Sequence, residues 1–202
     1  MVPTDLRVVK TLHQIDQSLP TNLAEMPFDK ITVDQLCQTA MVNRSTFYKY
    51  YKGKFDLMDQ YLSRTLEEFR RQMDVAFINA SPENIQNLVY QQNFEKALQF
   101  MYKHKREYLL LWKIPLEKPV FGTMVQVIHN NILESLTAPK GKTANFSQYV
   151  DLYAGLFASD MMTMVRWWFY HDGQIGIHEV RDLMRNNMKQ GMFRTFRQYL
   201  DQ

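Results

Sequence analysis

The segment Thr32–Leu57, TVDQLCQTAMVNRSTFYKYYKGKFDL, decides the fold that we expect for this chain. Thr32 and Gln35 have the spacing of a capping box, in which each side chain bonds the main-chain N–H of the other residue. Apolar residues then recur at helical spacing and predict a short helix with one buried face. These apolar residues are Val33, Leu36, Cys37 and Ala40.

A second short helix is expected after a turn of about three residues, the usual spacing of a helix-turn-helix. Asn43 suits the N-cap of this helix, because its side-chain oxygen can accept a hydrogen bond from a main-chain N–H near Ser45 or Thr46. Phe47 and Tyr51 lie four residues apart and therefore share one side, which we expect to be buried.

The opposite face of the second helix carries hydrogen-bond donors, cations and aromatic hydroxyls, which can meet phosphates and base edges. Residues 44–54 include four basic residues and no acid, a charge of +4, whereas the whole chain is +3 and the remainder therefore −1. Such a local excess is expected of a surface that binds a polyanion. A basic, solvated helix face is the alternative explanation when the charge is taken alone. The residues of this face are Arg44, Ser45, Thr46, Tyr48, Lys49 and Tyr50.

Residues 31–57 closely resemble the DNA-binding segment of TetR-family transcriptional regulators. The matching positions are a Thr-Val start, an apolar turn residue, a Thr-Phe-Tyr core, an aromatic residue and a lysine: Thr32, Val33, Val42, Thr46, Phe47, Tyr48, Tyr51 and Lys54. The family usually has glycine where this chain has Met41 and often has phenylalanine at the position of Tyr51. If the backbone at Met41 is left-handed, methionine costs about 1–2 kcal/mol there.

The resemblance implies an all-α fold of about nine helices. Residues 1–53 are expected to form a three-helix DNA-binding head with the helix-turn-helix, and residues 54–202 a helical bundle for ligand binding and dimerisation. We expect Arg44, Ser45 and Tyr50 to read bases. The expected phosphate contacts are Thr32, Thr46, Tyr48, Lys49 and Lys54, and Asn43 completes the set of DNA-binding positions.

The rest of the chain shows helical spacing of apolar residues, with no alternating strand pattern, internal repeat or low-complexity segment. A capping Ser81, Pro82 and Glu83 predict one helix start, and residues 137–145 are expected to form a loop. The expected helices outside the helix-turn-helix cover residues 5–23, 54–77, 81–102, 107–114, 120–136, 146–171 and 178–200.

The last two expected helices are apolar around much of their circumference, so we expect a second copy of the chain to cover them. Dimerisation through the last two helices is also what the resemblance implies. Trp167 and Trp168 point about 100° apart on a helix, so one is expected in the core and the other at the partner. The expected interface residues are Leu152, Leu156, Met164, Trp167, Trp168, Leu183, Met184, Met188, Met192 and Phe196.

TetR-like bodies commonly bind a small molecule among the middle helices. The candidate wall residues suit a plain core equally well, with His129 and Tyr108 as the expected polar anchors. Thirteen methionines fit either an adaptable pocket or an adaptable core. The candidates are Tyr102, Tyr108, Trp112, Phe121, Met124, Val125, His129 and Met161.

Other chemistry finds no support in the sequence. The five histidines include no pair three or four residues apart, and there is no GxSxG, P-loop or GxGxxG motif, so we expect no metal, no cofactor and no enzyme activity. The single Cys37 excludes an internal disulfide. Neither a secretory leader nor a long apolar run is present, so a cytoplasmic protein without a membrane anchor is expected.

These inferences predict a homodimeric, ligand-responsive transcriptional regulator, a repressor that binds a palindromic operator in double-stranded DNA and responds to a small-molecule effector. Residues 158–184 also resemble the dihydroxyacetone kinase regulator subgroup of the family, through Met164, Val165, Trp168, Asp172-Gly173 and Glu179. The subgroup leaves a second function open, a co-activator that keeps the TetR-like fold and acts through a protein partner.

Overall fold

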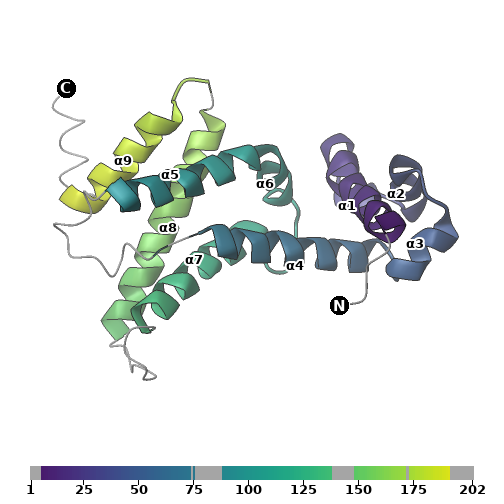
Figure 1. The fold of residues 1–202 in the computed structure, drawn as a ribbon, viewed down its shortest axis with the longest axis horizontal. Coiled ribbons are helices and arrows are strands. Elements are labelled where there is room, and N and C mark those ends of the chain that lie inside the picture. Colours follow the sequence, from purple (N-terminus) through teal and green to yellow (C-terminus); the bar gives the residue numbers. More distant parts are fainter. Residues whose placement is uncertain (1–5, 74, 76–87, 138–147, 172, 192–202) are drawn as a thin grey trace. The chain divides into compact units, whose positions relative to one another are not determined.

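The chain is described by a computed structural model that covers residues 6–73, 75, 88–137, 148–171 and 173–191. Within these residues the structure has nine α-helices, one short 3-10 helix and no strand (Figure 1). The prediction of an all-α fold is therefore confirmed. None of the described helices is both long enough and apolar enough to span a bilayer.

The chain divides into two compact units, Met1–Glu68 with Glu107–Glu117, and Phe69–Arg106 with Lys118–Gln202. The expected functional boundary after residue 53 stays a prediction, and the compact units divide after Glu68. The reason lies in α4 (Lys54–Gln72), whose first part bonds to the first unit: Tyr61 donates to Glu107 at 2.5 Å and Arg64 donates to Asp16 at 2.5 Å.

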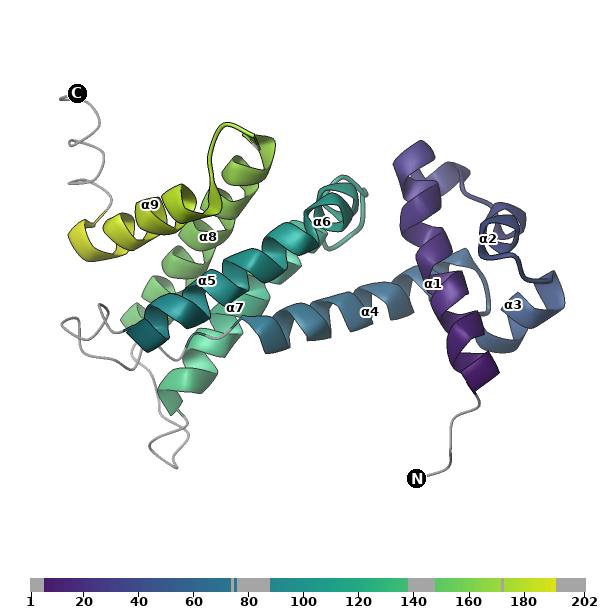
Figure 2. The ribbon, with the colours of Figure 1, turned by 45° about the horizontal axis from the view of Figure 1, so that its top comes forward.

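The first unit contains α1 (Leu6–Glu25), η1 (Phe28–Lys30), α2 (Val33–Ala40), α3 (Arg44–Tyr50), most of α4 and most of α6 (Lys105–Leu111). Figure 2 shows α1 lying beside α2 and α3, which form the expected three-helix head. The head is closed by apolar side chains that are almost completely buried. They are Ile15, Leu19, Leu36, Phe47 and Leu57.

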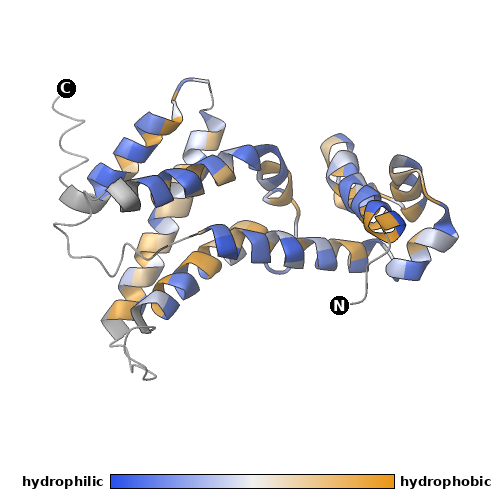
Figure 3. Cartoon of the chain, in the orientation of Figure 1, coloured by the Kyte–Doolittle hydropathy of each residue, from blue (hydrophilic) through white to orange (hydrophobic). Residues whose placement is uncertain are grey.

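The second unit contains α5 (Leu88–Lys103), α7 (Val120–Thr137), α8 (Gln148–Tyr170) and α9 (Ile177–Gln190). α7 packs along α8, while α9 packs against both α5 and α8. Apolar residues run along α7 and α8, which are orange over much of their length in Figure 3. The buried core of this unit includes Leu98, Met124, Ile128, Ile132, Ala158, Met162, Val165, Trp168, Val180 and Met184.

Polar contacts fix the helices of the second unit at its edges. Arg181 of α9 donates to Glu95 of α5 at 2.9 Å, and Asn187 of α9 donates to Asp160 of α8 at 2.6 Å. The pKa of the Asp160 carboxyl is raised, because the effect of burial exceeds the opposing effect of the hydrogen bond from Asn187.

Several helix boundaries differ from the sequence-based expectation. α6 begins at Lys105 rather than at residue 107 and ends at Leu111, before the expected residue 114. α9 ends at Gln190 because Gly191 takes a positive φ of 74° and closes the helix, whereas we expected it to continue to residue 200. Residues 76–87, with the predicted helix start at Ser81, residues 138–145 of the expected loop and residues 192–202 lie outside the described part of the chain.

Candidate nucleic-acid interface

α2 begins with the predicted capping box. The Thr32 hydroxyl accepts a hydrogen bond from the Gln35 N–H at 3.2 Å, and the Gln35 side-chain oxygen accepts one from the Thr32 N–H at 2.8 Å. Two otherwise unpaired donors of the first turn are satisfied in this way. The apolar stripe that follows is buried at Leu36, Cys37 and Ala40, so α2 is fixed in orientation against the head.

The turn between α2 and α3 contains three residues and is closed by a left-handed methionine. Met41 has φ 56° and ψ 41°, and its N–H donates to the Gln38 carbonyl at 3.1 Å. Its side chain is 88% exposed, so packing does not compensate for the backbone conformation. The chain therefore accepts at Met41 the strain that a glycine would avoid.

α3 is held to the head by its buried side. Phe47 is fully buried and Tyr51 is 2% exposed, as predicted. The Tyr51 hydroxyl donates to a carboxylate oxygen of Asp16 in α1 at 2.8 Å, and Arg64 of α4 donates to the same oxygen. Burial, followed by the bond to Asp16, raises the pKa of Tyr51 to about 12. One carboxylate thus joins the end of α3 to two neighbouring helices.

The predicted cap by Asn43 is wrong in one respect. Asn43 occupies the N-cap position of α3 with an extended backbone, but its side chain makes no capping hydrogen bond. The side chain is exposed, and so remains among the groups that could meet DNA.

The outer face of α3 brings together most of the predicted DNA-binding side chains. Arg44, Ser45, Tyr48 and Lys49 are exposed, and Thr46 and Tyr50 are half-buried beside them. The Lys49 ammonium lies 5.6 Å from the centre of the Tyr50 ring, and the Tyr48 ring packs edge-on against Phe47 at 5.6 Å. A donor-rich, cationic face therefore stands on a buried, hydrogen-bonded base.

Arg44 is engaged within this face. Its Nη1 atom donates to the two carboxylate oxygens of Asp34 at 2.7 and 3.0 Å, and its Nη2 atom donates to the Tyr48 hydroxyl at 3.3 Å. The hydrogen bond to Tyr48, together with the nearby Asp34 charge, raises the pKa of Arg44. The guanidinium consequently stays charged under all ordinary conditions.

Lys54, an expected phosphate contact, is engaged inside the head, and the phosphate contact stays a prediction. Its ammonium donates to the main-chain carbonyls of Phe28, Asp29 and Ile31 at 3.0, 2.9 and 2.7 Å, so all three of its N–H donors have partners. At the same helix start, the Asp56 carboxylate accepts from the Lys52 N–H at 2.7 Å. This bond is the main reason why the pKa of Asp56 is lowered.

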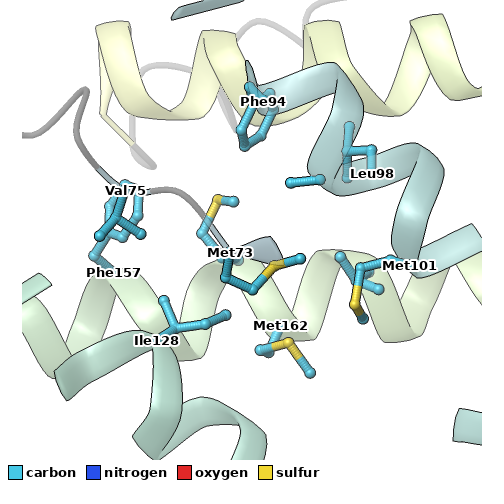
Figure 4. Close-up of a pocket in the computed structure, with 11 residues that line it drawn as sticks. Met73, Val75, Phe94, Leu98, Met101, Ile128, Phe157 and Met162 are labelled. Atoms are coloured by element: carbon cyan, nitrogen blue, oxygen red, sulfur yellow. The ribbon is translucent and has the colours of Figure 1, made fainter. Parts of the chain in front are cut away.

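A small apolar cavity of about 30 Å³ lies in the second unit (Figure 4). Among the predicted wall residues only Met161 lines it. Every described side chain around it ends in carbon or sulfur, including four methionines, and no polar group points into it from the labelled residues of Figure 4. The lining residues are Met73, Val75, Phe94, Ala97, Leu98, Met101, Ile128, Phe157, Met161, Met162 and Val165.

The other candidate ligand residues lie elsewhere. Tyr108 is 1% exposed within the first unit and stacks on Trp112 with ring centres 6.2 Å apart. His129, the other expected anchor, has Nε2 3.0 Å from a carboxylate oxygen of Asp151 and thus bridges α7 and α8. Tyr102 stacks on Trp168 at 5.1 Å.

The three remaining candidates are on α7. The guanidinium carbon of Arg166 lies 4.0 Å from the centre of the Phe121 ring, Met124 is fully buried and Val125 is half-buried.

The sequence signal available for the cavity was the helical spacing of apolar residues on α5 and α8. This spacing could not show which faces of the two helices oppose each other.

The residues expected at a dimer interface differ in their exposure. Leu152, Leu156 and Trp167 are 53%, 55% and 41% exposed on one side of α8. Trp168 and Met184 are 1% exposed, and the Trp168 indole N–H donates to the Ile175 carbonyl at 2.9 Å, so these two belong to the core. Met164 and Leu183 are half-buried, while the side chains of Met188, Met192 and Phe196 lie outside the described part.

Trp167 and Trp168 therefore face different environments, one outward and one inward, as a 100° step on a helix allows. In the described residues no cluster of three His, Cys, Asp or Glu side chains is arranged to hold a metal ion.

Comparisons with known proteins give a clear result for the fold. No family model matches the sequence, and no curated protein matches it. Among solved structures, the dihydroxyacetone kinase operon activator DhaS superimposes with a TM-score of 0.56 and 14% sequence identity, covering 92% of this chain and 96% of DhaS. A Clostridium perfringens protein described as a fatty acid metabolism regulator superimposes with a TM-score of 0.59 and 17% identity, covering 89% of this chain and 98% of that protein.

These neighbours are TetR-family regulators, and they match along nearly their whole length. Identities this low establish the fold alone. The capping box, the three-residue turn and the burial of Phe47 and Tyr51 agree with the fold of these neighbours. This chain has the fold of TetR-family transcriptional regulators.

Proposed function

We propose that this protein is a homodimeric DNA-binding transcriptional regulator that represses transcription from a palindromic operator and responds to a small apolar effector. The observation that carries the proposal is the outer face of α3, which combines exposed Arg44, Ser45, Tyr48 and Lys49 with a base fixed by Phe47 and Tyr51. Such a face suits the major groove, where side-chain donors meet base edges and phosphates.

The charge supports this assignment. Residues 44–54 carry +4, and only Arg44 of the four cations forms an ion pair with an acid among the described contacts. Lys49 remains a candidate for a phosphate contact, as do the side chains of Thr46 and Tyr48, while Ser45 and Tyr50 remain candidates for base contacts. Thr32 lies at the start of α2, where its N–H and hydroxyl already serve the capping box.

A dimer is supported by the outer side of α8. Leu152, Leu156 and Trp167 share one helical face, with Ser159 and Thr163 between them, and all five are exposed in the single chain. Apolar side chains grouped on one side of a helix are commonly covered by a partner subunit. Two recognition helices related by a two-fold axis would read half-sites about 34–36 Å apart, which is why we expect a palindrome.

The effector that suits the cavity is apolar and uncharged. A carboxylate or ammonium buried against carbon and sulfur alone would lose its hydration without a partner, at a cost of several kcal/mol. The cavity of about 30 Å³ holds roughly one water's share of volume, so an effector would enter only as the methionines repack. It would shift the protein only by preferring one body conformation over another.

The experiment that tests the DNA-binding function is selection from a random duplex pool by the purified protein, with Tyr48→Ala as the control. An enriched palindrome that is lost in the control supports the proposal. Absence of enrichment at low salt contradicts the proposal. It favours instead the co-activator function, which the resemblance of residues 158–184 had left open.

The effector class is tested separately by thermal unfolding with a matched pair of ligands. Benzene should raise the unfolding midpoint, whereas benzoate, which has the same ring and a charge, should not. Ala97→Val should reduce the rise, because its added methyl groups occupy part of the cavity of about 30 Å³. A response to benzoate alone would contradict an uncharged effector.

A further inference from the structure

We propose that Asp34 is a positioning residue for Arg44, which sets the base preference of the recognition helix at the cost of weaker binding to DNA in general. The inference rests on the proposed function and concerns a residue that makes no predicted DNA contact itself. It starts from the geometry of the contact between α2 and α3.

The guanidinium of Arg44 is held from two sides. Asp34, in the first turn of α2, accepts two hydrogen bonds from Nη1, and Tyr48, one turn further along α3, accepts one from Nη2. The guanidinium carbon also lies 5.7 Å from the centre of the Tyr48 ring. Tyr48 is itself oriented by its edge-on contact with the fully buried Phe47. The position of Arg44 is thus linked to the core of the head.

Stability does not explain this arrangement. The Arg44 and Asp34 side chains are 59% and 57% exposed, and ion pairs in that environment contribute little to folding. What the contacts do is restrict a long, flexible side chain to one direction. A guanidinium has five N–H donors, so at least two remain beyond the three hydrogen bonds observed. Two donors are what a bidentate contact with a guanine edge requires.

Asp34 also has an electrostatic effect of opposite sign. It places a negative charge beside a face that is otherwise cationic, and it neutralises Arg44 as a partner for phosphates. The same carboxylate should therefore favour a defined base contact and disfavour contacts with the uniform DNA backbone. This combination separates a positioning role from a structural one, because loss of structure would weaken both kinds of binding.

The test compares Asp34→Asn with Asp29→Asn, which removes the same charge from an exposed residue of the head that pairs only weakly, at 3.7 Å, with Lys30. Affinities are measured for the selected operator and for random duplex over a range of salt. Asp34→Asn should lower the ratio of operator to random affinity about tenfold. It should also raise affinity for random duplex and steepen its salt dependence by about one phosphate contact. Asp29→Asn should leave the ratio unchanged.

Two further variants keep the test decisive if Asp34→Asn folds poorly. Arg44→Lys keeps the charge but lacks the planar fork, and should lower the ratio to a similar extent. In an Arg44→Ala background, Asp34→Asn should have no further effect on the ratio. An equal loss in that background, or a ratio in Asp34→Asn that matches Asp29→Asn, overturns the inference. If the wild-type protein selects no sequence at all, the proposed function itself fails, and this inference with it.

Discussion

The Lys54 ammonium donates a hydrogen bond of 2.7 Å to the main-chain carbonyl of Ile31, the residue that precedes the capping box of α2. The same nitrogen bonds the carbonyls of Phe28 and Asp29, and it lies 5.1 Å from the centre of the Phe28 ring. A single side chain from the start of α4 therefore fixes the segment that leads into the helix-turn-helix.

Replacing Lys54 should damage folding rather than DNA affinity. Lys54→Met leaves three carbonyls without their donor and should lower the free energy of unfolding by about 2 kcal/mol. The measurement is urea unfolding followed by circular dichroism. Lys52→Met, at an exposed position two residues earlier, should change it by less than about 0.5 kcal/mol. Normal stability with a shallower salt dependence of DNA binding would restore the phosphate role that the sequence had suggested.

Met41→Gly should stabilise the protein. Glycine adopts the left-handed conformation without the steric cost that methionine bears, and part of this gain is offset by the greater freedom of glycine in the unfolded chain. The expected net gain is about 0.5–1 kcal/mol, measured by the same urea unfolding. As a control, Gln38→Gly within α2 should destabilise by about 1 kcal/mol. A loss of stability in Met41→Gly would show that the exposed side chain makes contacts that matter.

Tyr51 should make stability sensitive to high pH. Its pKa is raised to about 12 by burial and by the bond to Asp16, whereas an unfolded tyrosine titrates near 10. The folded state therefore keeps a proton that the unfolded state has lost, so the contribution is complete below pH 10 and disappears as the pH rises through 12. Unfolding free energies measured from pH 9 to 12 should fall more steeply in the wild type than in Tyr51→Phe. Parallel profiles would contradict the buried, bonded hydroxyl.

Leu156→Glu should convert the proposed dimer to a monomer without unfolding it, because this side chain is 55% exposed in the single chain. A charge at the centre of an apolar interface remains desolvated and unpaired. Sedimentation equilibrium gives the mass, and Leu6→Glu, the same change at an 83% exposed leucine of the first unit, serves as the matched control. A dimer that persists in Leu156→Glu would place the interface elsewhere.

Lys49→Ala should weaken binding to all duplexes and reduce the slope of log affinity against log salt by about 0.9, the value of one phosphate contact. Arg44→Ala should instead relax base choice with a smaller change in that slope. Fluorescence anisotropy at several salt concentrations distinguishes the two variants. Sequence-selective loss in Lys49→Ala would reverse the assigned roles.

Local sequence patterns were sufficient for the head. The capping box at Thr32, the three-residue turn and the burial of Phe47 and Tyr51 all depend on residues close together in the chain, so spacing alone predicted them. Comparison with the glycine usual in the family raised a left-handed backbone at Met41 as one of the alternatives, and the structure has that conformation.

Contacts between distant residues were not predictable in the same way. Lys54 reaches carbonyls 23 to 26 residues earlier in the chain, and main-chain acceptors carry no sequence signature. The cavity was largely missed for a related reason: periodicity shows that α5 and α8 have apolar faces but not which faces oppose each other. Tyr108 and His129 accordingly looked like pocket residues, although the first packs in the other unit and the second pairs with Asp151.

The placement of the methionines gives the protein its own spectroscopic labels. Met73, Met101, Met161 and Met162 surround the cavity, while Met41 stands 88% exposed on the turn before α3. The sulfur atom separates each terminal methyl group from other protons, so its signal is not split by scalar coupling, and the group rotates rapidly. Protein labelled with carbon-13 at these methyl groups would therefore resolve them in a carbon–proton correlation spectrum. Filling of the cavity and docking of the turn on DNA could then be followed in one titration, each through its own resonances.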